Sequence, residues 1–177
     1  MTAKEIVEAI RLAAGAEGIR QIFLVGCGGS MAGLYPAWYL LSREAKNLRV
    51  EYHTSNEFVH AVPAACGAQS VVICCSLMDT PETVEACRTA VEKGAYAIAL
   101  AGSEHSKMIG LTPYSICYRN FDARKRDTSA VQTKHALALR IAFEFLHQLE
   151  GYAAYDDAMK AYEMLDSILL DALRYSD

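Results

Sequence analysis

The sequence lacks an excess of basic residues. Its 177 residues include 17 lysines and arginines against 21 aspartates and glutamates, a formal charge of −4. A nucleic-acid backbone needs a positive surface, so we expect no nucleic-acid partner. Long apolar runs are also missing, because residues 1–8 alternate charged and apolar side chains and no later stretch is long enough to span a bilayer. We therefore expect a cytoplasmic protein with no membrane partner.

Metal-binding and redox patterns are missing as well. The sequence has 6 cysteines, and none of their spacings resembles a metal knuckle or a redox pair. Cys74 and Cys75 are adjacent, so in a strand they point to opposite faces and are poorly placed to hold one tetrahedral metal. We expect buried, reduced thiols, no metal site and no cofactor.

The composition that remains is that of one domain over residues 1–177, with 53% hydrophobic and 21% charged residues. Short apolar runs alternate with longer segments of helical period, which predicts a parallel sheet with helices on both faces. The expected strands span residues 21–25, 48–53, 70–75, 95–101 and 114–118. The expected helices span residues 3–14, 31–43, 103–109, 129–149 and 155–175, and one more begins at Pro81, with a loop at residues 120–127.

A glycine-rich turn, Gly26-Cys27-Gly28-Gly29-Ser30, joins the first strand to a helix. Such a turn lets backbone N–H groups approach an anion, although a tight turn that only needs glycine explains it equally well. No lysine lies beside it, so a triphosphate loop is not expected. A dinucleotide site is disfavoured because Met31 replaces a small residue and because no acid ends the second strand at 52–54.

A second turn, residues 75–80, follows the third strand and leads to Thr80-Pro81-Glu82-Thr83. Pro81 fits the first position of a helix, and Thr80 fits either its N-cap or a ligand contact. In a doubly wound sheet the two turns meet at one crevice, where two helix amino ends face one ligand. This arrangement suits a singly phosphorylated small molecule.

Four segments together resemble the sugar isomerase (SIS) domain family: 26–30, 54–58, 80–83 and Ala130-Val131-Gln132-Thr133-Lys134. The match looks closest to the amino-terminal half of two-domain enzymes such as fructosamine-6-phosphate deglycases and the isomerase part of glucosamine-6-phosphate synthase. The resemblance implies a three-layer, flavodoxin-like αβα domain with a five-stranded parallel sheet, which binds a phosphosugar. The binding residues it implies are Gly28, Gly29, Ser30, Cys75, Ser76, Thr80 and Gln132.

The sequence departs from the family in two ways. Cys75 and Leu77 stand where the family has serines, and Met78 stands where it has a glycine, which removes two hydroxyl donors and adds bulk beside the phosphate. The 177 residues match one SIS domain, so we expect no second SIS domain, which in the two-domain relatives supplies most of the catalytic groups. The candidate catalysts within the chain are Glu57, His105 and His135, with Glu82 and Asp127 as further acids, and each has a purely structural alternative.

Two functions from different classes follow. The first is a phosphosugar-binding domain of an isomerase or deglycase, acting by acid–base proton transfer between C1 and C2 of the sugar. The second is a non-catalytic binding module, or a half-enzyme that needs a partner chain. The helix at 129–149 is apolar nearly all round, so we expect residues 129–177 to pair two copies into a homodimer or higher homo-oligomer.

Overall fold

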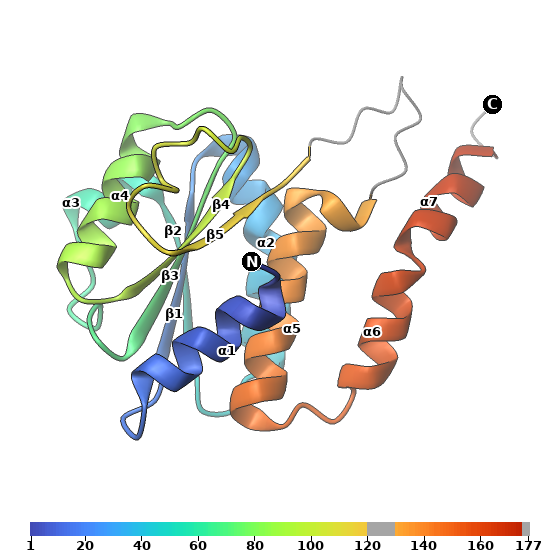
Figure 1. The fold of residues 1–177 in the computed structure, drawn as a ribbon, viewed down its shortest axis with the longest axis horizontal. Coiled ribbons are helices and arrows are strands. Elements are labelled where there is room, and N and C mark those ends of the chain that lie inside the picture. The colour runs from blue at the N-terminus through green and yellow to red at the C-terminus, as the bar shows by residue number, and fades with distance from the viewer. Residues whose placement is uncertain (120–129, 175–177) are drawn as a thin grey trace.

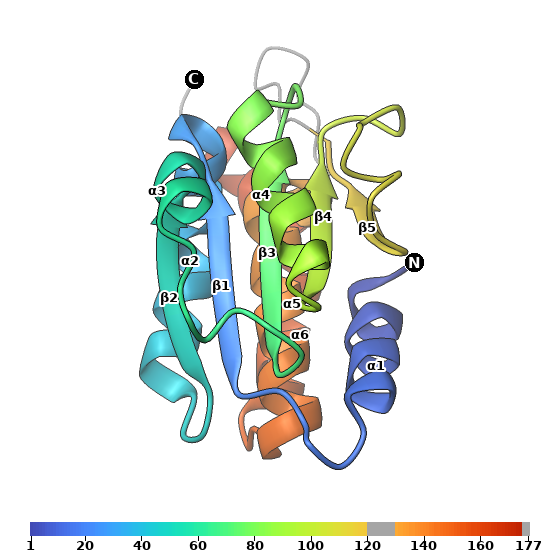
Figure 2. The ribbon, with the colours of Figure 1, turned by 90° about the vertical axis from the view of Figure 1, so that its left-hand side faces the viewer.

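A five-stranded parallel sheet forms the centre of the molecule (Figures 1 and 2). The computed structural model describes residues 1–119 and 130–174. The strands are β1 (Gln21–Gly26), β2 (Arg49–Thr54), β3 (Ser70–Ser76), β4 (Tyr96–Ala101) and β5 (Tyr114–Cys117), in the spatial order β2-β1-β3-β4-β5. Every neighbouring pair is parallel, which confirms the predicted αβα fold.

The strands form where the apolar runs are short and continuous. β1 and β3 are buried at every position, as central strands covered on both faces must be. β2 lies at an edge and is only half-buried, in line with its charged residues, and its bounds lie one residue later than those expected.

Helices cover both faces of this sheet (Figure 2). On one face lie α1 (Ala3–Ala14), α2 (Gly28–Glu44) and α5 (Lys134–Glu150), and on the other lie α3 (Ser55–His60) and α4 (Pro81–Glu92). The helix α3 was not predicted from the sequence; it is short and starts at a capping box between Thr54 and Glu57. No helix of the described residues has the length and apolar character to cross a membrane.

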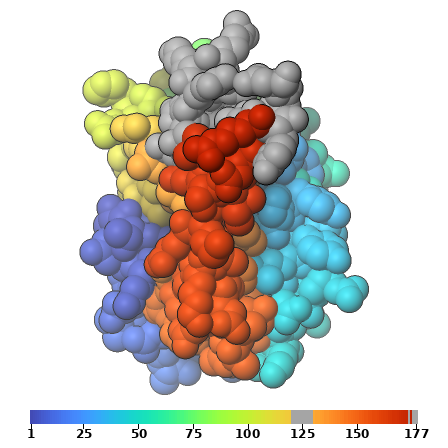
Figure 3. All heavy atoms as spheres, turned by 90° about the vertical axis from the view of Figure 1, so that its right-hand side faces the viewer, coloured from blue at the N-terminus to red at the C-terminus, as the bar shows by residue number. Residues whose placement is uncertain are grey.

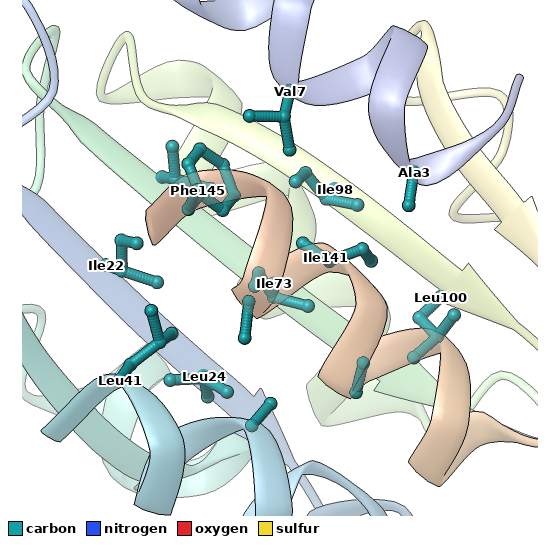
Figure 4. Packing of buried hydrophobic residues seen from close by; sticks show 14 of the residues in the cluster. Ala3, Val7, Ile22, Leu24, Leu41, Ile73, Ile98, Leu100, Ile141 and Phe145 are labelled. Atoms are coloured by element: carbon teal, nitrogen blue, oxygen red, sulfur yellow. The ribbon is translucent and has the colours of Figure 1, made fainter. Parts of the chain in front are cut away.

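The larger core lies between the sheet and α5 (Figure 4). Ile141 and Phe145 of α5 pack on alternate residues of the central strands, and Val7 of α1 and Leu41 of α2 close its sides. All four are at most 1% exposed. Burial of such side chains contributes about 1.5–3 kcal/mol each, so this layer fixes α5 against the sheet.

The C-terminal helices run along the outer side of α5 (Figures 1 and 3). The expected single helix at 155–175 is two helices, α6 (Tyr155–Glu163) and α7 (Leu165–Arg174). They separate at Met164, whose N–H is shared between the carbonyls of Lys160 and Ala161 and so tightens the last turn of α6. Residue 175 lies outside the described residues.

The expected helix at 103–109 is wrong. This segment forms successive hydrogen-bonded turns, with Ser106 N–H donating to Ser103 O and Ile109 N–H to Ser106 O. Asp79 explains the difference, because its carboxylate accepts hydrogen bonds from the Ser106 hydroxyl and from Lys107 N–H at 2.8 Å. A tertiary partner therefore takes the donors that a helix would use.

Two helices start at residues other than those predicted from the sequence. α2 begins at Gly28, three residues before the expected start, so the glycines form its first turn. The expected helix at 129–149 begins as a short 3-10 turn (Ala130–Gln132), and α5 itself starts at Lys134. The expected loop at 120–127, Asp127 and Ser129 lie outside the described residues.

Candidate functional site

The candidate site lies at the carboxyl edge of the sheet, where β1 and β3 end side by side. Gly26 of β1 is in register with Cys75 of β3. The helix after β1 packs on one face of the sheet, and the helix after β3 packs on the other. This divergence between neighbouring strands is a topological switch point, the place where doubly wound sheets bind ligands.

The β1–α2 turn brings backbone N–H groups to this edge. A Cβ added at Gly26 would lie 3.0 Å from Met31 N, so glycine gives the close approach of the helix start to the strand the room that it needs. Gly28 has a φ of +50°, a conformation that side chains disfavour. Gly28 and Gly29 are exposed, whereas Ser30 is buried to 9% exposure in the first turn of α2.

The β3–α4 turn brings the hydroxyls of Ser76 and Thr80 to the same edge. Thr80 is the N-cap residue of α4, but its side chain makes no capping hydrogen bond, contrary to its expected role as a side-chain cap. The Ser76 hydroxyl instead accepts a hydrogen bond from Thr80 N–H at 3.0 Å and lies 3.4 Å from Thr80 Oγ1. The Thr80 hydroxyl is therefore not used to cap the helix.

Leu77 and Met78 do not close the turn. Met78 is 85% exposed. Leu77 lies against the end of β4, where a Cβ added at Gly102 would come within 2.5 Å of Leu77 O and 2.7 Å of Leu77 Cδ1. Of the residues that differ from the family pattern, Met78 is thus directed to solvent and Leu77 to the end of β4.

Hydrogen bonds join three turns at this edge. The hydroxyls of Ser55, at the start of α3, and Thr83, in the first turn of α4, are 2.8 Å apart. Thr83 Oγ1 in turn lies 3.9 Å from the sulfur of Cys27, at the start of α2. The turns after β1, β2 and β3 therefore meet.

Cys75 lies at the inner side of the site, close to Ser30, Lys134 and Tyr118. Burial raises the pKa of the Cys75 thiol to about 11, although the Ser30 hydroxyl and the Lys134 ammonium partly oppose this. The thiol is therefore neutral near pH 7 and is not an activated nucleophile. Of the other five cysteines, Cys66, Cys74 and Cys87 are buried, Cys27 is half-buried and Cys117 is exposed, all as free thiols.

The candidate catalytic residues do not gather at one point. Glu57 is exposed, and its carboxylate accepts hydrogen bonds from Thr54 N–H at 2.9 Å and Thr54 Oγ1 at 2.8 Å. These bonds lower the pKa of Glu57, which makes it a weaker base. His105 is exposed in the turns after β4, where its N–H donates to Ser103 Oγ. Their catalytic roles stay predictions.

His135 and Gln132 lie at the start of α5. His135 is exposed, but partial desolvation of its ring and the neighbouring Lys134 lower its pKa, so the ring is neutral near pH 7. Gln132 is exposed, and its carbonyl accepts a hydrogen bond from Arg119 N–H at 2.8 Å, which ties the segment after β5 to this turn. Glu82 is exposed in the first turn of α4. Their roles toward a ligand also stay predictions.

Lys134 lies at the site, although no role was predicted for it from the sequence segment 130–134. A Cβ added at Gly33 would lie 2.8–2.9 Å from Lys134 Cγ, Cδ and Cε, and one added at Gly29 would lie 3.7 Å from Lys134 Nζ. The lysine thus crosses α2 toward its first turn. No pattern in the sequence predicts this contact, because it joins two helices far apart in the chain. Within the described residues, no cluster of His, Cys, Asp or Glu is suited to a metal ion.

No family model matches the sequence. Fructosamine deglycase FrlB of Bacillus subtilis (strain 168) is 32% identical over 157 residues, which is 88% of this chain and 47% of FrlB. A protein from Salmonella typhimurium LT2 described as a phosphosugar isomerase is 39% identical with a TM-score of 0.89, covering 99% of this chain and 52% of its own. The NanR protein of Vibrio vulnificus in complex with ManNAc-6P shares only the fold, at 16% identity and a TM-score of 0.58, over 90% of this chain and 58% of NanR.

The fold, the switch-point turns and these likenesses together define the chain as a sugar isomerase (SIS) domain, and it belongs to that family. Its particular relatives are the fructosamine deglycase FrlB and the Salmonella protein, to which it is similar over nearly all of its own length. The chain spans about half the length of each of these relatives.

Proposed function

We propose that this chain binds a sugar phosphate at the switch point between β1 and β3, as an SIS half-site of the sugar-phosphate isomerase or fructosamine-6-phosphate deglycase type. The observation that carries the proposal is the meeting of the amino ends of α2 and α4 on adjacent central strands. Ser30 and Thr80 bring hydroxyls to these ends. Helix amino ends and hydroxyls are the groups that hold phosphate esters in proteins.

The relatives support the ligand class. The names of FrlB and the Salmonella protein point to sugar derivatives, and NanR, which has the same fold, was crystallised with a sugar phosphate. Phosphate binding would anchor the sugar, and an acid–base pair would move a proton between C1 and C2.

A non-catalytic module, or a half-enzyme completed by a partner, is the second candidate function. The Glu57 carboxylate is engaged in the cap of α3, so the only acid of the Thr54–Phe58 segment is poorly placed to accept a proton from a sugar carbon. Relatives twice as long have a further half that can supply such a group. Turnover of fructose 6-phosphate or of a phosphorylated fructosamine by the chain alone distinguishes the two functions.

Calorimetry and thermal unfolding with fructose 6-phosphate, glucose 6-phosphate and the unphosphorylated sugars test the binding proposal. A ligand at about 100 times its Kd stabilises the folded state by about 2.7 kcal/mol. We expect Ser30→Ala and Thr80→Val to lose most of this gain. Ser42→Ala and Thr89→Val, in later turns of the same two helices, are the matched controls. Equal stabilisation by phosphorylated and plain sugars would contradict the proposal.

A further inference from the structure

Lys134 holds a positive charge where two helices begin. It is the first residue of α5, directly after the N-cap Thr133. Its side chain lies across Gly33, where a Cβ would come within 2.8 Å of two of its carbons, and its ammonium lies beside Gly29 in the first turn of α2. Because neither glycine has a side chain, the lysine has room to lie against α2.

This position is unfavourable for a cation on its own. The amino end of a helix carries a partial positive charge, which favours anions there and cations at the opposite end. None of the ion pairs formed within residues 1–119 and 130–174 includes Lys134. An anion placed beside Lys134 would interact favourably with the ammonium and with the amino ends of α2 and α5 together.

Tyr118 gives an independent indication of a ligand at the same place. Its side chain is 3% exposed, and its hydroxyl makes no hydrogen bond with the described residues. Ser30 and Cys75 are near enough to affect the pKa of Tyr118, but neither side chain forms a hydrogen bond of good geometry with its hydroxyl. A buried hydroxyl without a partner is costly, so it points to an oxygen that arrives with a ligand.

We propose that Lys134 supplies the positive charge that binds the phosphate group of the sugar phosphate, and that the Tyr118 hydroxyl donates a hydrogen bond to the same ligand. This inference rests on the proposed function and places the phosphate on the α2 side of the switch point, next to Ser30. A side chain at position 33 would displace the lysine from this path.

Calorimetry at pH 7.5 with fructose 6-phosphate, fructose and inorganic phosphate tests this inference. Lys134→Met is expected to weaken fructose 6-phosphate and inorganic phosphate at least tenfold and to leave fructose unchanged. Gly33→Ala keeps the ammonium but forces its chain to move, so it is expected to weaken the same two ligands. Lys46→Met makes the same charge change before β2, at the opposite edge of the sheet, and is expected to bind as the wild type does.

A pH series adds a readout that loss of structure would not produce. Phosphate monoesters become dianions near pH 6, so wild-type affinity for fructose 6-phosphate is expected to rise between about pH 5 and pH 7. This rise should be much smaller in Lys134→Met. Circular dichroism checks that each variant is folded, and if Lys134→Met does not fold, Gly33→Ala decides the question.

The outcomes separate this inference from the function on which it rests. If the folded wild type binds neither fructose 6-phosphate nor inorganic phosphate, the proposed function fails. If the wild type binds them and both Lys134→Met and Gly33→Ala bind equally well, only the role of Lys134 fails. An equal loss of fructose and fructose 6-phosphate in Lys134→Met would also overturn it, because the lysine would then contact the sugar.

Discussion

At the scale of single residues, the hydroxyl of Tyr118 is the clearest unsatisfied group among the described residues. Tyr118→Phe removes a buried donor that has no partner, so we expect the unliganded domain to gain about 1 kcal/mol of unfolding free energy. The same variant should lose part of the stabilisation by fructose 6-phosphate. Urea unfolding with and without the ligand measures both effects. A less stable unliganded variant would show that the hydroxyl is already bonded.

Glu57 gives a residue-scale prediction about pH. Hydrogen bonds from Thr54 lower the folded-state pKa of this carboxyl. Its contribution to stability is therefore present above its unfolded pKa of about 4.3 and is lost as the pH falls through the lower folded value. Glu57→Gln keeps the capping-box pattern but cannot titrate, so its stability should fall less than that of the wild type below pH 4. Urea unfolding at pH 7 and pH 3.5 provides the comparison, and parallel losses would contradict it.

At the scale of elements, the contact between α5 and α6 depends on Glu144. This carboxylate is fully buried and accepts hydrogen bonds from Arg140 at 2.9 and 3.0 Å, from Gln148 at 3.0 Å and from the Tyr155 hydroxyl. Burial alone would raise its pKa, but these donors outweigh burial and lower it. Glu144→Gln should cost about 1–3 kcal/mol of unfolding free energy, whereas Glu163→Gln, exposed on α6, should cost almost nothing.

The turn after β3 makes a second element-scale prediction. Because Leu77 O occupies the space of a Cβ at Gly102, Gly102→Ala must move the backbone of the turn that carries Ser76 and Thr80. We expect a loss of about 1–3 kcal/mol in stability together with weaker sugar-phosphate binding. Gly110→Ala is the matched control, since a Cβ there lies 3.7 Å from its nearest neighbour. Urea unfolding and calorimetry check both, and equal behaviour of the two variants would refute this account of the turn.

At the scale of the whole molecule, α5 is covered by other elements of the same chain more fully than we expected from the sequence. The sheet, α1, α2 and α6 surround it, so a second copy is not needed for that purpose. On the C-terminal helices, exposed large apolar side chains lie further out, at Met164, Ile168 and Leu170. The expected homodimer stays a prediction, now placed on α6 and α7.

Sedimentation over a range of concentrations tests that dimer. Ile168→Asp places a charge in the exposed apolar surface and should shift the protein toward monomer. Leu12→Asp on α1 changes a residue that is at least as exposed but lies outside this surface, so it should leave the association unchanged. A wild-type monomer at every concentration would refute the pairing.

Sequence alone determined the sheet. Buried parallel strands need continuous apolar runs, and such runs can be recognised in the sequence without knowledge of their tertiary contacts. It also determined the two glycine- and threonine-containing turns, whose residues fit helix starts after strands. Its failures were local segments with tertiary partners. Residues 103–109 form turns because Asp79 accepts hydrogen bonds from Ser106 and Lys107, and the Thr80 hydroxyl makes no capping hydrogen bond with α4.

Only the tertiary structure decided which side chains share the switch point. Lys134 and Gly33 are separated by most of the chain, and their contact depends on how α5 packs across α2. Tyr118 follows an edge strand, yet its hydroxyl reaches the turn after β1. The periodicity of apolar residues in the sequence indicates which face of a helix or strand is buried. Which distant polar groups come together depends instead on how the helix layers pack on the sheet.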